Sequence, residues 1–559
     1  MGGFNRNNMK NTTVSDIIAK SIYEAGIATV FAVPGVNVMP ILEAIEKHDG
    51  LKLVICKTEL GAAYMADAYA RIKGQGCCIG TTGPGILNTV TGVAGSYYDS
   101  VPVLVISAEV SKNEIGKYGI QEMSGIGRTP NVLDIMKNIT KDTCLVDSVS
   151  EVKNKLTNAI QLMRSGRKGP VYIEFYQDML QEDCNDISNM ECEFLEEEHS
   201  FDFSEMNRIL DESFQKIVII GNGARNCEAE KLLDFAQKIG ASVVTTALAK
   251  GIISEAESIN LGVIGCYGDF RANRAVERAD TIVVLGATLG YLSTCGWSLH
   301  LVDKTIIRVD IDEEELKRNV ESKLHYCNDI EVWISEFLKY FENNNLVYRK
   351  SPSDDKSIDL DVIADANQFN ALIMKNISDT VSGKDVVIAD VGQNAYWAER
   401  YIKAQNANFI IHGGMGAMGY GVAGSIGVQL ALKDCRRNGK VVCVCGDGGY
   451  LMTGLELHTA NIYKASVIWV VLNNHELGTQ NAWANREKYK VKFDIEEVDI
   501  KNIAKSLGVN SIAVDGIEQF RTEFKKAYSQ ISPTLIEVNC QKGIKPKAYY
   551  GTEVKNINR

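Results

Sequence analysis

Short runs of apolar residues alternate with longer segments of helical periodicity along most of the chain. In the first third, apolar runs of strand length occupy residues 28–33, 53–56, 77–81, 103–106 and 171–175. Runs that are apolar at most positions are typical of strands buried on both faces of a sheet. Because a helical segment lies between successive strands, neighbouring strands are expected to run parallel. This part of the chain is therefore predicted to form a doubly wound parallel sheet.

The same alternation occurs twice more. Further strands are predicted at residues 216–220, 242–246, 281–285, 305–310, 441–445 and 467–472. Two polar stretches, 181–205 and 342–358, separate the three segments, and charge-rich stretches are usually solvated linkers. We therefore expect an α/β fold with three doubly wound parallel-sheet domains, at residues 10–185, 200–345 and 360–550.

Composition narrows the class of protein. The chain has 559 residues, 45% of them hydrophobic, which is enough to bury several cores. Its 59 basic and 71 acidic residues give a net charge of −12, which argues against a nucleic-acid partner or an anionic membrane surface. No run approaches the ~18 apolar residues of a membrane helix, and the start lacks the apolar core of a signal peptide. We therefore expect a cytoplasmic protein. The 14 cysteines show no CxxC pairs and are expected to be buried thiols.

The third segment contains a motif suited to phosphate and metal. A predicted buried strand ends at Gly446-Asp447-Gly448, where glycines let backbone N–H groups approach a phosphate and a helix N-terminus follows. Asp447 offers one hard oxygen, and Asn474, at the end of the next strand, offers an amide oxygen. Mg²⁺ takes few protein oxygens and completes its shell with phosphate oxygens and water. A lone Gly-Asp-Gly is usually only a turn, but the second strand with its paired asparagines favours a diphosphate and Mg²⁺ site.

This motif resembles the signature of thiamine diphosphate enzymes, in the group of acetohydroxyacid synthases, pyruvate oxidases and pyruvate decarboxylases. The three segments match the family's layout of pyrimidine-binding, central and diphosphate-binding domains, so the resemblance covers nearly the whole chain. It implies that thiamine diphosphate and Mg²⁺ are bound, with Asp447, Asn474 and Glu476 at the metal. The implied cofactor contacts at this end of the chain are Gly446, Asp447, Gly448, Gly449, Asn474, Glu476, Leu477 and Gly478.

The first segment matches the family at the cofactor-activating residue. Glu59 follows a predicted strand at the start of a helix, where open α/β sheets place their ligands. The resemblance implies that its carboxyl group hydrogen-bonds the aminopyrimidine and favours removal of the thiazolium C2 proton. A helix-capping role is the alternative, since acids are common in a first turn. The family's neighbouring loops are matched by Pro34, Gly35, Thr82, Gly83 and Asn88.

Two further matches lie in the third segment. Gly416 and Met418, in a glycine-rich stretch, match the place where the family has a bulky apolar residue beneath the cofactor. The resemblance implies that Met418 holds the two rings of the cofactor in reactive geometry. Gln393 and Asn394 match contacts to the diphosphate, although Asn394 replaces the more usual histidine.

Within the group, the acetohydroxyacid synthases are matched best. Gln121 and Trp483 stand where that family lines the pocket over the reactive carbon, so the implied catalytic residues are Glu59, Gln121, Met418 and Trp483. Trp483 could equally be an interface or core aromatic residue. The chain departs from the family at Ile120, Thr58 and Val36, which replace phenylalanine, histidine and glycine, and these departures leave the acceptor open.

The central segment bears on flavin. Lys250-Gly251, residues 261–265 and residues 310–312 resemble the flavin-binding stretches of acetohydroxyacid synthases and oxidases. Residues 286–290, however, lack the family's arginine and acid cluster, and residues 221–224 form only a weak dinucleotide loop. FAD therefore stays an open alternative to a nucleotide fold kept for packing.

The resemblance implies decarboxylation of a 2-oxo acid, with pyruvate as the expected donor, followed by carboligation to a second carbonyl. The alternatives are a non-oxidative decarboxylase, a flavin-linked pyruvate oxidase, acyl transfer to a keto-sugar nucleotide, and a binding or regulatory subunit without activity. The family builds each active site from two chains, so a homodimer or homotetramer is expected.

Overall fold

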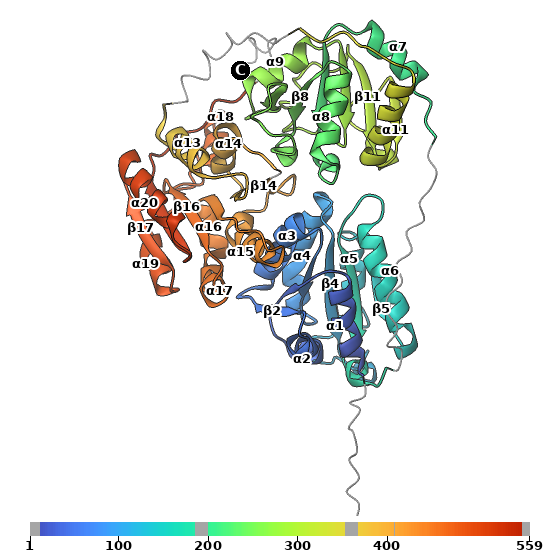
Figure 1. Cartoon of the computed structure of the whole chain (residues 1–559). Helices are drawn as coiled ribbons and strands as arrows, with labels where there is room; N and C mark the ends of the chain where they lie inside the picture. Colours follow the sequence, from blue (N-terminus) through green and yellow to red (C-terminus); the bar gives the residue numbers. More distant parts are fainter. Residues whose placement is uncertain (1–11, 185–199, 353–366, 407, 550–559) are drawn as a thin grey trace, which may run out of the picture. The chain divides into compact units, whose positions relative to one another are not determined.

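The computed structural model describes residues 12–184, 200–352, 367–406 and 408–549. Three sheets of six strands each follow one another along the chain, and within each sheet all neighbouring strands are parallel. Helices flank each sheet (Figure 1). The prediction of an α/β fold with three doubly wound parallel sheets is confirmed. The chain divides into two compact units, the first with sheet one and residues 426–437, the second with the other two sheets.

The first sheet has the strand order β2-β1-β3-β4-β6-β5. Its strands are β1 (Thr29–Ala32), β2 (Lys52–Ile55), β3 (Gly76–Ile79), β4 (Val103–Glu109), β5 (Thr143–Val146) and β6 (Val171–Tyr176). Its helices are α1 (Val14–Glu24), α2 (Met39–Lys47), α3 (Glu59–Lys73), α4 (Pro84–Tyr98), α5 (Val132–Lys137) and α6 (Val152–Arg164). The edge strand β5 is only half-buried, which explains why its apolar signal is weak in the sequence.

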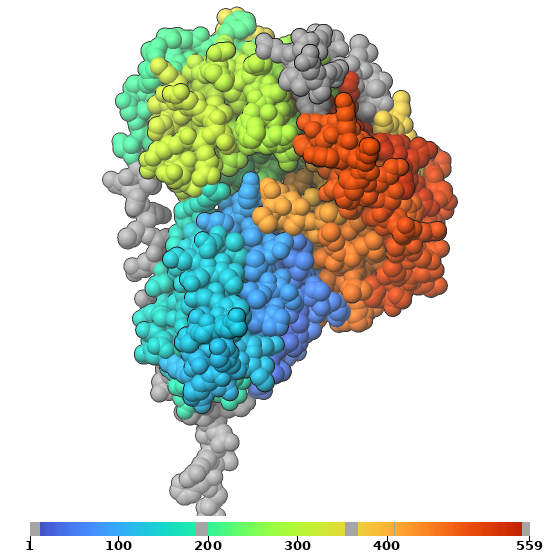
Figure 2. All heavy atoms as spheres, turned by 180° about the vertical axis from the view of Figure 1, so that it is seen from behind, coloured from blue at the N-terminus to red at the C-terminus, as the bar shows by residue number. Residues whose placement is uncertain are grey.

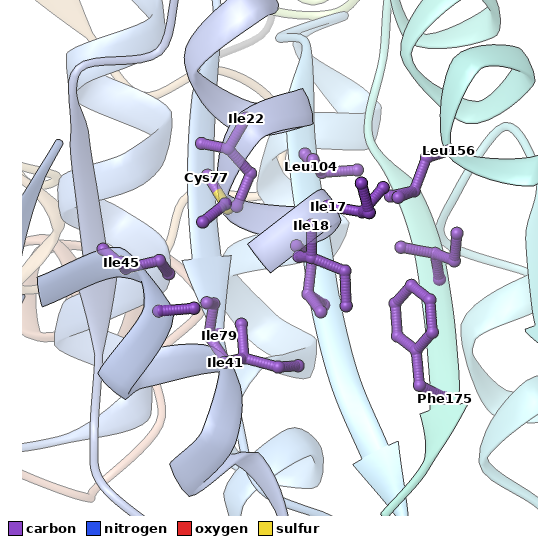
Figure 3. Packing of buried hydrophobic residues seen from close by; sticks show 14 of the residues in the cluster. Ile17, Ile18, Ile22, Ile41, Ile45, Cys77, Ile79, Leu104, Leu156 and Phe175 are labelled. Atoms are coloured by element: carbon purple, nitrogen blue, oxygen red, sulfur yellow. The ribbon is translucent and has the colours of Figure 1, made fainter. Parts of the chain in front are cut away.

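Alternate strand residues point to opposite faces of this sheet. On one face, Ile79, Leu104 and Phe175 pack against isoleucines of α1 and α2 and against Leu156 of α6 (Figure 3). On the other face, α3 and α4 pack against each other and against the strands. Because α3 and α4 begin just beyond β2 and β3, their first turns lie at the carboxyl ends of the strands, where α/β sheets bind ligands.

The second sheet has the order β12-β11-β10-β7-β8-β9, which is that of dinucleotide-binding folds. Its strands are β7 (Lys216–Ile220), β8 (Ser242–Thr245), β9 (Asn260–Val263), β10 (Thr281–Leu285), β11 (Thr305–Asp310) and β12 (Leu324–Cys327). Its helices are α7 (Ser204–Glu212), α8 (Ala229–Lys238), α9 (Phe270–Arg278), α10 (Glu313–Leu316) and α11 (Ile330–Asn343). One core lies between the strands and α7, α8 and α11, and a second lies between the strands and α9.

The third sheet, β14-β13-β15-β16-β18-β17, repeats the strand order of the first. Its strands are β13 (Val386–Ala389), β14 (Phe409–Ile411), β15 (Val441–Gly446), β16 (Val467–Asn473), β17 (Asn510–Val514) and β18 (Thr534–Asn539). The helices are α13 (Phe369–Thr380), α14 (Gln393–Tyr401), α15 (Tyr420–Asp434), α16 (Asp447–Thr453), α17 (Leu457–Ile462), α18 (Gly478–Arg486), α19 (Ile500–Ser506) and α20 (Ile517–Ser529). The surface of this domain, coloured orange and red, is seen from behind in the space-filling view (Figure 2).

Among the described residues, every cysteine is a free thiol and most are buried, and no three or more His, Cys, Asp or Glu side chains gather as a metal cluster. No helix in this part of the chain is both long enough and apolar enough to span a membrane. The polar stretches expected as linkers fall partly on residues 185–199 and 353–366, outside the described residues.

Candidate functional site

The first half-site is formed around Glu59 at the start of α3. Thr58 is the N-cap of this helix, and its hydroxyl accepts a hydrogen bond from the Gly61 N–H at 3.0 Å. Glu59 therefore does not serve as the cap. Its Oε2 accepts a hydrogen bond from Asn88 Nδ2 of α4 at 3.1 Å. Two helices that begin after β2 and β3, the strands on either side of β1, thus bring together a carboxylate and an amide that the sequence placed in one site.

The loops expected beside the pyrimidine meet at the turn before α4. Gly83 has φ +72°, and a Cβ placed there would lie 2.7 Å from the Cβ of Gln121. A Cβ on Gly35, which follows Pro34, would lie 2.3 Å from the Cβ of Thr81. Only glycine permits either approach. The structure therefore gathers the Pro34–Gly35 loop, the turn at Thr82 and Gly83, and Gln121 in the same unit as Glu59.

The second half-site is a cavity at the carboxyl ends of β13, β15 and β16. The cavity has a volume of about 140 Å³ and opens to solvent. Its walls include all the cofactor contacts that the resemblance implied in the third domain: Gln393, Asn394, Gly416, Met418, Gly446, Asp447, Gly448, Gly449, Asn474, Glu476, Leu477 and Gly478. These residues come from four segments of the chain, so only the tertiary fold makes them one site.

Asp447 has the environment of a cation ligand. Its Oδ1 accepts a hydrogen bond from the Gly448 N–H at 2.9 Å, while its Oδ2 is buried and has no hydrogen-bond partner among the described residues. Burial raises the pKa of this carboxyl group. An unpaired buried carboxylate oxygen is costly, and a bound Mg²⁺ would satisfy it. The donor set of the cavity therefore fits a metal at Asp447.

The other two implied metal ligands differ from Asp447. Asn474 lines the cavity, and its Oδ1 has only a long contact, 3.4 Å, with the Glu476 N–H. Both carboxylate oxygens of Glu476 accept hydrogen bonds, from the Gly543 N–H at 2.6 Å and from Asn481 Nδ2 at 2.9 Å. Asn474 is thus the better available partner for Asp447, and Glu476 mainly ties the wall of the cavity together.

Asp390, which the sequence analysis missed, holds the loop that carries Met418. Its side chain is fully buried, and its two oxygens accept hydrogen bonds from the N–H groups of Gly419 at 3.0 Å and Gly421 at 2.9 Å. Burial raises the pKa of Asp390 to about 6. A Cβ on Gly449 would lie 1.9 Å from Asp390 Oδ2, so the Gly-Asp-Gly turn packs directly on this carboxylate. The available signal was an acid directly after the short apolar run 386–389, which the sequence analysis did not predict as a strand.

Gln393 and Asn394 lie at the start of α14. Asn394 Nδ2 donates to the backbone oxygens of Asp390 at 2.6 Å and Val444 at 3.3 Å, so this amide joins the ends of β13 and β15. A Cβ on Gly478 would lie 2.9 Å from Gln393 Oε1. Asn394 thus has a structural function in addition to its position in the cavity wall.

Trp483 does not line the cavity. It lies on α18 with 51% of its surface exposed, and the Arg486 guanidinium stacks 4.6 Å above its ring. Trp397 of α14, by contrast, is fully buried and forms part of the cavity wall. The structure therefore separates Trp483 from the other site residues of its domain.

The glycines of the weak dinucleotide loop and of residues 286–290 pack against each other. The Gly223 N–H donates to Gly286 O at 3.0 Å, and a Cβ on Gly223 would lie 2.8 Å from Gly286 Cα. Lys250 donates to both carboxylate oxygens of Glu255 at 2.7 Å. These groups are used in internal contacts and do not form a donor set for a dinucleotide, so the FAD alternative has no support.

Comparisons with known proteins agree with this arrangement. Residues 12–127 match the N-terminal TPP binding domain of thiamine pyrophosphate enzymes, residues 203–339 the central domain, and residues 390–538 the C-terminal TPP binding domain.

Three curated relatives illustrate the similarity over the whole length. An acetolactate synthase large subunit of Lactococcus lactis is 28% identical, covering 95% of this chain and 92% of its own. That of Haemophilus influenzae is 27% identical over 93% of each chain. A probable acetolactate synthase large subunit of Methanocaldococcus jannaschii is 26% identical over 94% of this chain and 91% of its own. With three parallel sheets and two half-sites at their strand ends, the chain belongs to the thiamine pyrophosphate enzyme family, among its acetolactate synthase-like members.

Proposed function

We propose that this protein is a thiamine diphosphate- and Mg²⁺-dependent carboligase that decarboxylates a 2-oxo acid, with pyruvate as donor, and joins the acyl unit to a second carbonyl. The observation that carries the proposal is the cavity of the third domain, where Asp447 Oδ2 is buried without a hydrogen-bond partner among the described residues. The Glu59–Asn88 pair supports it independently. When bound, thiamine diphosphate supplies the electron sink that decarboxylation requires.

The residues of the third domain would bind and orient the cofactor. Asp447 and Asn474 would hold Mg²⁺ through one carboxylate and one amide oxygen. The glycines at 446, 448 and 449 leave room for the diphosphate, because side chains there would occupy the cavity wall. Met418, whose loop is held by Asp390, would keep the two cofactor rings in reactive geometry.

Glu59 would handle the proton in this reaction. Asn88 Nδ2 donates to Glu59 Oε2 and orients the carboxyl group, while Oε1 has no hydrogen-bond partner among the described residues and would exchange a proton with the pyrimidine. Proton transfer by a positioned carboxyl group typically contributes about 10²-fold to 10⁴-fold in rate.

We also propose at least a homodimer, in which the Glu59 half-site of one subunit completes the cavity of its partner. Three large apolar side chains of the segment from α16 to α17 support an interface, since Leu451, Met452 and Leu455 are all exposed. Light scattering of the active protein tests this assembly. A monomer that still forms ligated product would overturn it.

The decisive experiment incubates the purified protein with thiamine diphosphate, Mg²⁺ and carbon-13 pyruvate, and follows the products by NMR. Acetolactate is the expected product, with pyruvate as both donor and acceptor. Free acetaldehyde that persists when aldehyde and 2-oxobutyrate acceptors are added would reduce the function to decarboxylation. Unchanged pyruvate, in a sample that binds the cofactor, would overturn pyruvate as donor.

A further inference from the structure

The segment between β4 and α5 carries Ile120 and Gln121, and the proposed function does not explain which contacts hold these two residues in place. Ile120 is 87% exposed, and Gln121 next to it is exposed and adopts a left-handed backbone with φ +69°. A non-glycine residue in this region carries strain, so neighbouring contacts must hold it there. The question is which groups do so.

Glu122 closes the loop internally. Its Oε1 accepts hydrogen bonds from the Gly116 N–H at 2.6 Å and the Ser124 hydroxyl at 2.5 Å, and its Oε2 accepts one from the Gly119 N–H at 3.1 Å. These contacts fix the shape of the loop. They do not attach it to the sheet.

Glu109, the last residue of β4, makes that attachment. Its side chain is buried, its Oε2 accepts a hydrogen bond from the Met123 N–H at 2.9 Å, and its Oε1 accepts one from the Val110 N–H at 2.8 Å. The Thr82 hydroxyl lies 3.5 Å from the same Oε1. Hydrogen bonds to a carboxylate are the strong ones, so one side chain ties the loop to a rigid strand end.

Thr82 extends this attachment to Gln121 itself. Its hydroxyl has one proton, which Gln121 O at 3.2 Å is better placed to accept than Glu109 Oε1 at 3.5 Å, and the adjacent Gly83 allows the Gln121 Cβ to pack on the turn. The same turn starts α4, which carries Asn88, the partner of Glu59. Glu109 therefore contacts both the loop that carries Gln121, through the Met123 N–H, and the turn that carries Thr82 at the start of α4.

Glu109 lies beside a second buried carboxyl group. Glu174 and Tyr172 of β6 lie on the same buried face, since Glu174 pairs with Ser107 and Glu109 is two residues further along β4. The Tyr172 hydroxyl donates to Glu174 Oε1 at 2.8 Å, and burial together with the nearby Glu109 raises the pKa of Glu174 to about 8. Burial also raises the pKa of Glu109, and the hydrogen bonds from the Val110 and Met123 N–H groups oppose this rise, so these backbone donors favour its ionised form.

We propose that Glu109 is a positioning residue for carboligation: by fixing the backbone on either side of Gln121, it presents this side chain to the second carbonyl substrate and favours ligation over release of free aldehyde. This inference rests on the proposed function and deepens it. Glu109 itself touches no substrate.

Glu109→Gln tests the proposal. The amide has the same shape but only one acceptor oxygen and no charge, so either the Met123 or the Val110 N–H loses its acceptor and the remaining hydrogen bond is weaker. With pyruvate, Mg²⁺ and thiamine diphosphate we expect the ratio of acetolactate to acetaldehyde to fall at least tenfold, with less than a twofold change in the cofactor Kd. Hydrogen exchange should accelerate in residues 116–124 only. Glu114→Gln, an exposed acid of the same segment, is the matched control.

Thr82→Val is the second variant, in case Glu109→Gln does not fold. It removes the hydroxyl while keeping the volume and should shift the product ratio in the same direction by a smaller factor. A wild-type product ratio and unchanged loop exchange in both variants would overturn the positioning role. The exchange measurement needs no turnover. If the wild-type protein forms no product, the proposed function alone fails, and the positioning role stands or falls on faster exchange of the loop in Glu109→Gln.

Discussion

Single carboxylates decide how each half-site meets its ligand. One carboxylate oxygen of Glu59 accepts a hydrogen bond from Asn88, whereas one buried oxygen of Asp447 has no hydrogen-bond partner among the described residues. Leaving such an oxygen unsatisfied costs about 1–3 kcal/mol or more. The unpaired oxygen of Asp447 therefore destabilises the unliganded protein, and a cation that binds there removes this cost and so binds more tightly.

Asp447→Asn should weaken binding of thiamine diphosphate with Mg²⁺ at least tenfold, because the amide offers the metal no charge. The melting temperature without ligands should be no lower than that of the wild type, since a buried charge has been removed. Calorimetric titration and thermal melts with and without ligands check both statements. Asp379→Asn, an exposed acid on α13, is the control. Wild-type affinity in Asp447→Asn would remove this residue from the metal site.

Glu59→Gln should lower turnover by about 10²-fold to 10⁴-fold and leave the melting temperature unchanged, because the amide keeps the Asn88 contact but cannot exchange a proton. Steady-state rates and thermal melts measure the two effects. The control is Glu46→Gln on α2, which is exposed. Turnover within threefold of the wild type would exclude the proton-handling role.

At the scale of elements, β4 and β6 bury a polar row on one face of the first sheet. Ser107, Glu109, Tyr172 and Glu174 alternate with apolar residues that pack on the opposite face. Strand periodicity alone puts the four on one side. Because this row contains buried carboxyl groups, the stability of the first sheet should depend on pH.

The stability contributed by Glu174 should fall as pH rises from about 5 to 8. Its pKa in the folded protein is about 8, above the value of ~4.3 in an unfolded chain. The folded state therefore holds its proton longer, and the contribution, fully present below pH ~4, is lost by pH 8 at up to about 1.4 kcal/mol per pH unit.

Glu174→Gln cannot ionise and should remove this loss. The melting temperature of Glu174→Gln relative to that of the wild type should therefore rise between pH 5 and pH 8. The exposed Glu182→Gln should show no such trend. Parallel melting curves of wild type and Glu174→Gln across this range would contradict the assignment.

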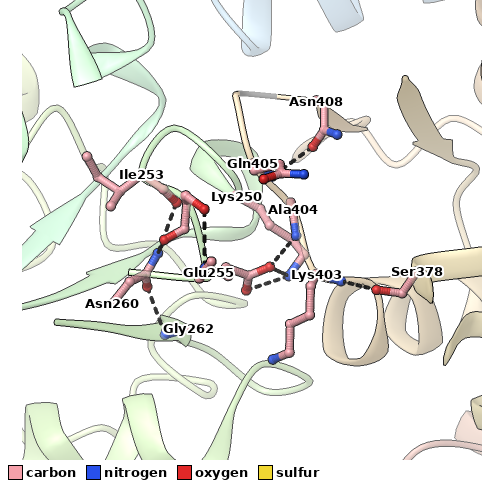
Figure 4. Close-up of polar contacts among 12 residues, drawn as sticks. Lys250, Ile253, Glu255, Asn260, Gly262, Ser378, Lys403, Ala404, Gln405 and Asn408 are labelled. Carbon is pink, nitrogen blue, oxygen red and sulfur yellow. Dashed lines mark hydrogen bonds and ion pairs between the residues drawn. The ribbon is translucent and has the colours of Figure 1, made fainter. Parts of the chain in front are cut away.

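At the scale of the whole molecule, a buried ion pair helps to join the central domain to the third domain within the second compact unit. Lys250 and Glu255 are 1% and 3% exposed, and Glu255 Oε2 also accepts a hydrogen bond from the Ala404 N–H of the third domain at 2.6 Å (Figure 4). Tyr267 stacks on Tyr396 with ring centroids 3.7 Å apart across the same two domains. The central domain thus supports the third domain from the side, and this supporting contact uses the lysine that resembled a flavin ligand.

Lys250→Met should lower the melting temperature markedly, because it leaves a buried carboxylate without its cation at a cost of about 3–5 kcal/mol. The double variant Lys250→Met with Glu255→Leu should recover much of the loss. Lys339→Met, which breaks a surface pair with Glu336, should change little. Scanning calorimetry measures all three. An unchanged melting temperature in Lys250→Met would show that the pair contributes nothing to stability.

The sequence was most informative where function depends on local spacing. The Gly-Asp-Gly turn, Asn474 and Met418 could be placed on one cavity because each follows a recognisable strand or glycine stretch. Asp390, Glu109 and the Lys250–Glu255 pair could not, because their partners lie on other segments and carry no motif. Trp483 shows that a position matching the family does not fix where a side chain lies, since its ring is half exposed and does not line this cavity.

By itself, the sequence determined the three parallel sheets, because strand burial and helix starts are encoded by neighbouring residues. Its resemblance to thiamine diphosphate enzymes indicated the segments that are expected to bind the cofactor. Only the tertiary structure decided which carboxylates are left unsatisfied, which are neutral and which hold a loop. Those properties depend on burial and on donors from distant segments, and no local pattern reports them. The unpaired oxygen of Asp447 and the anchored loop of Gln121 are therefore consequences of folding as much as of sequence.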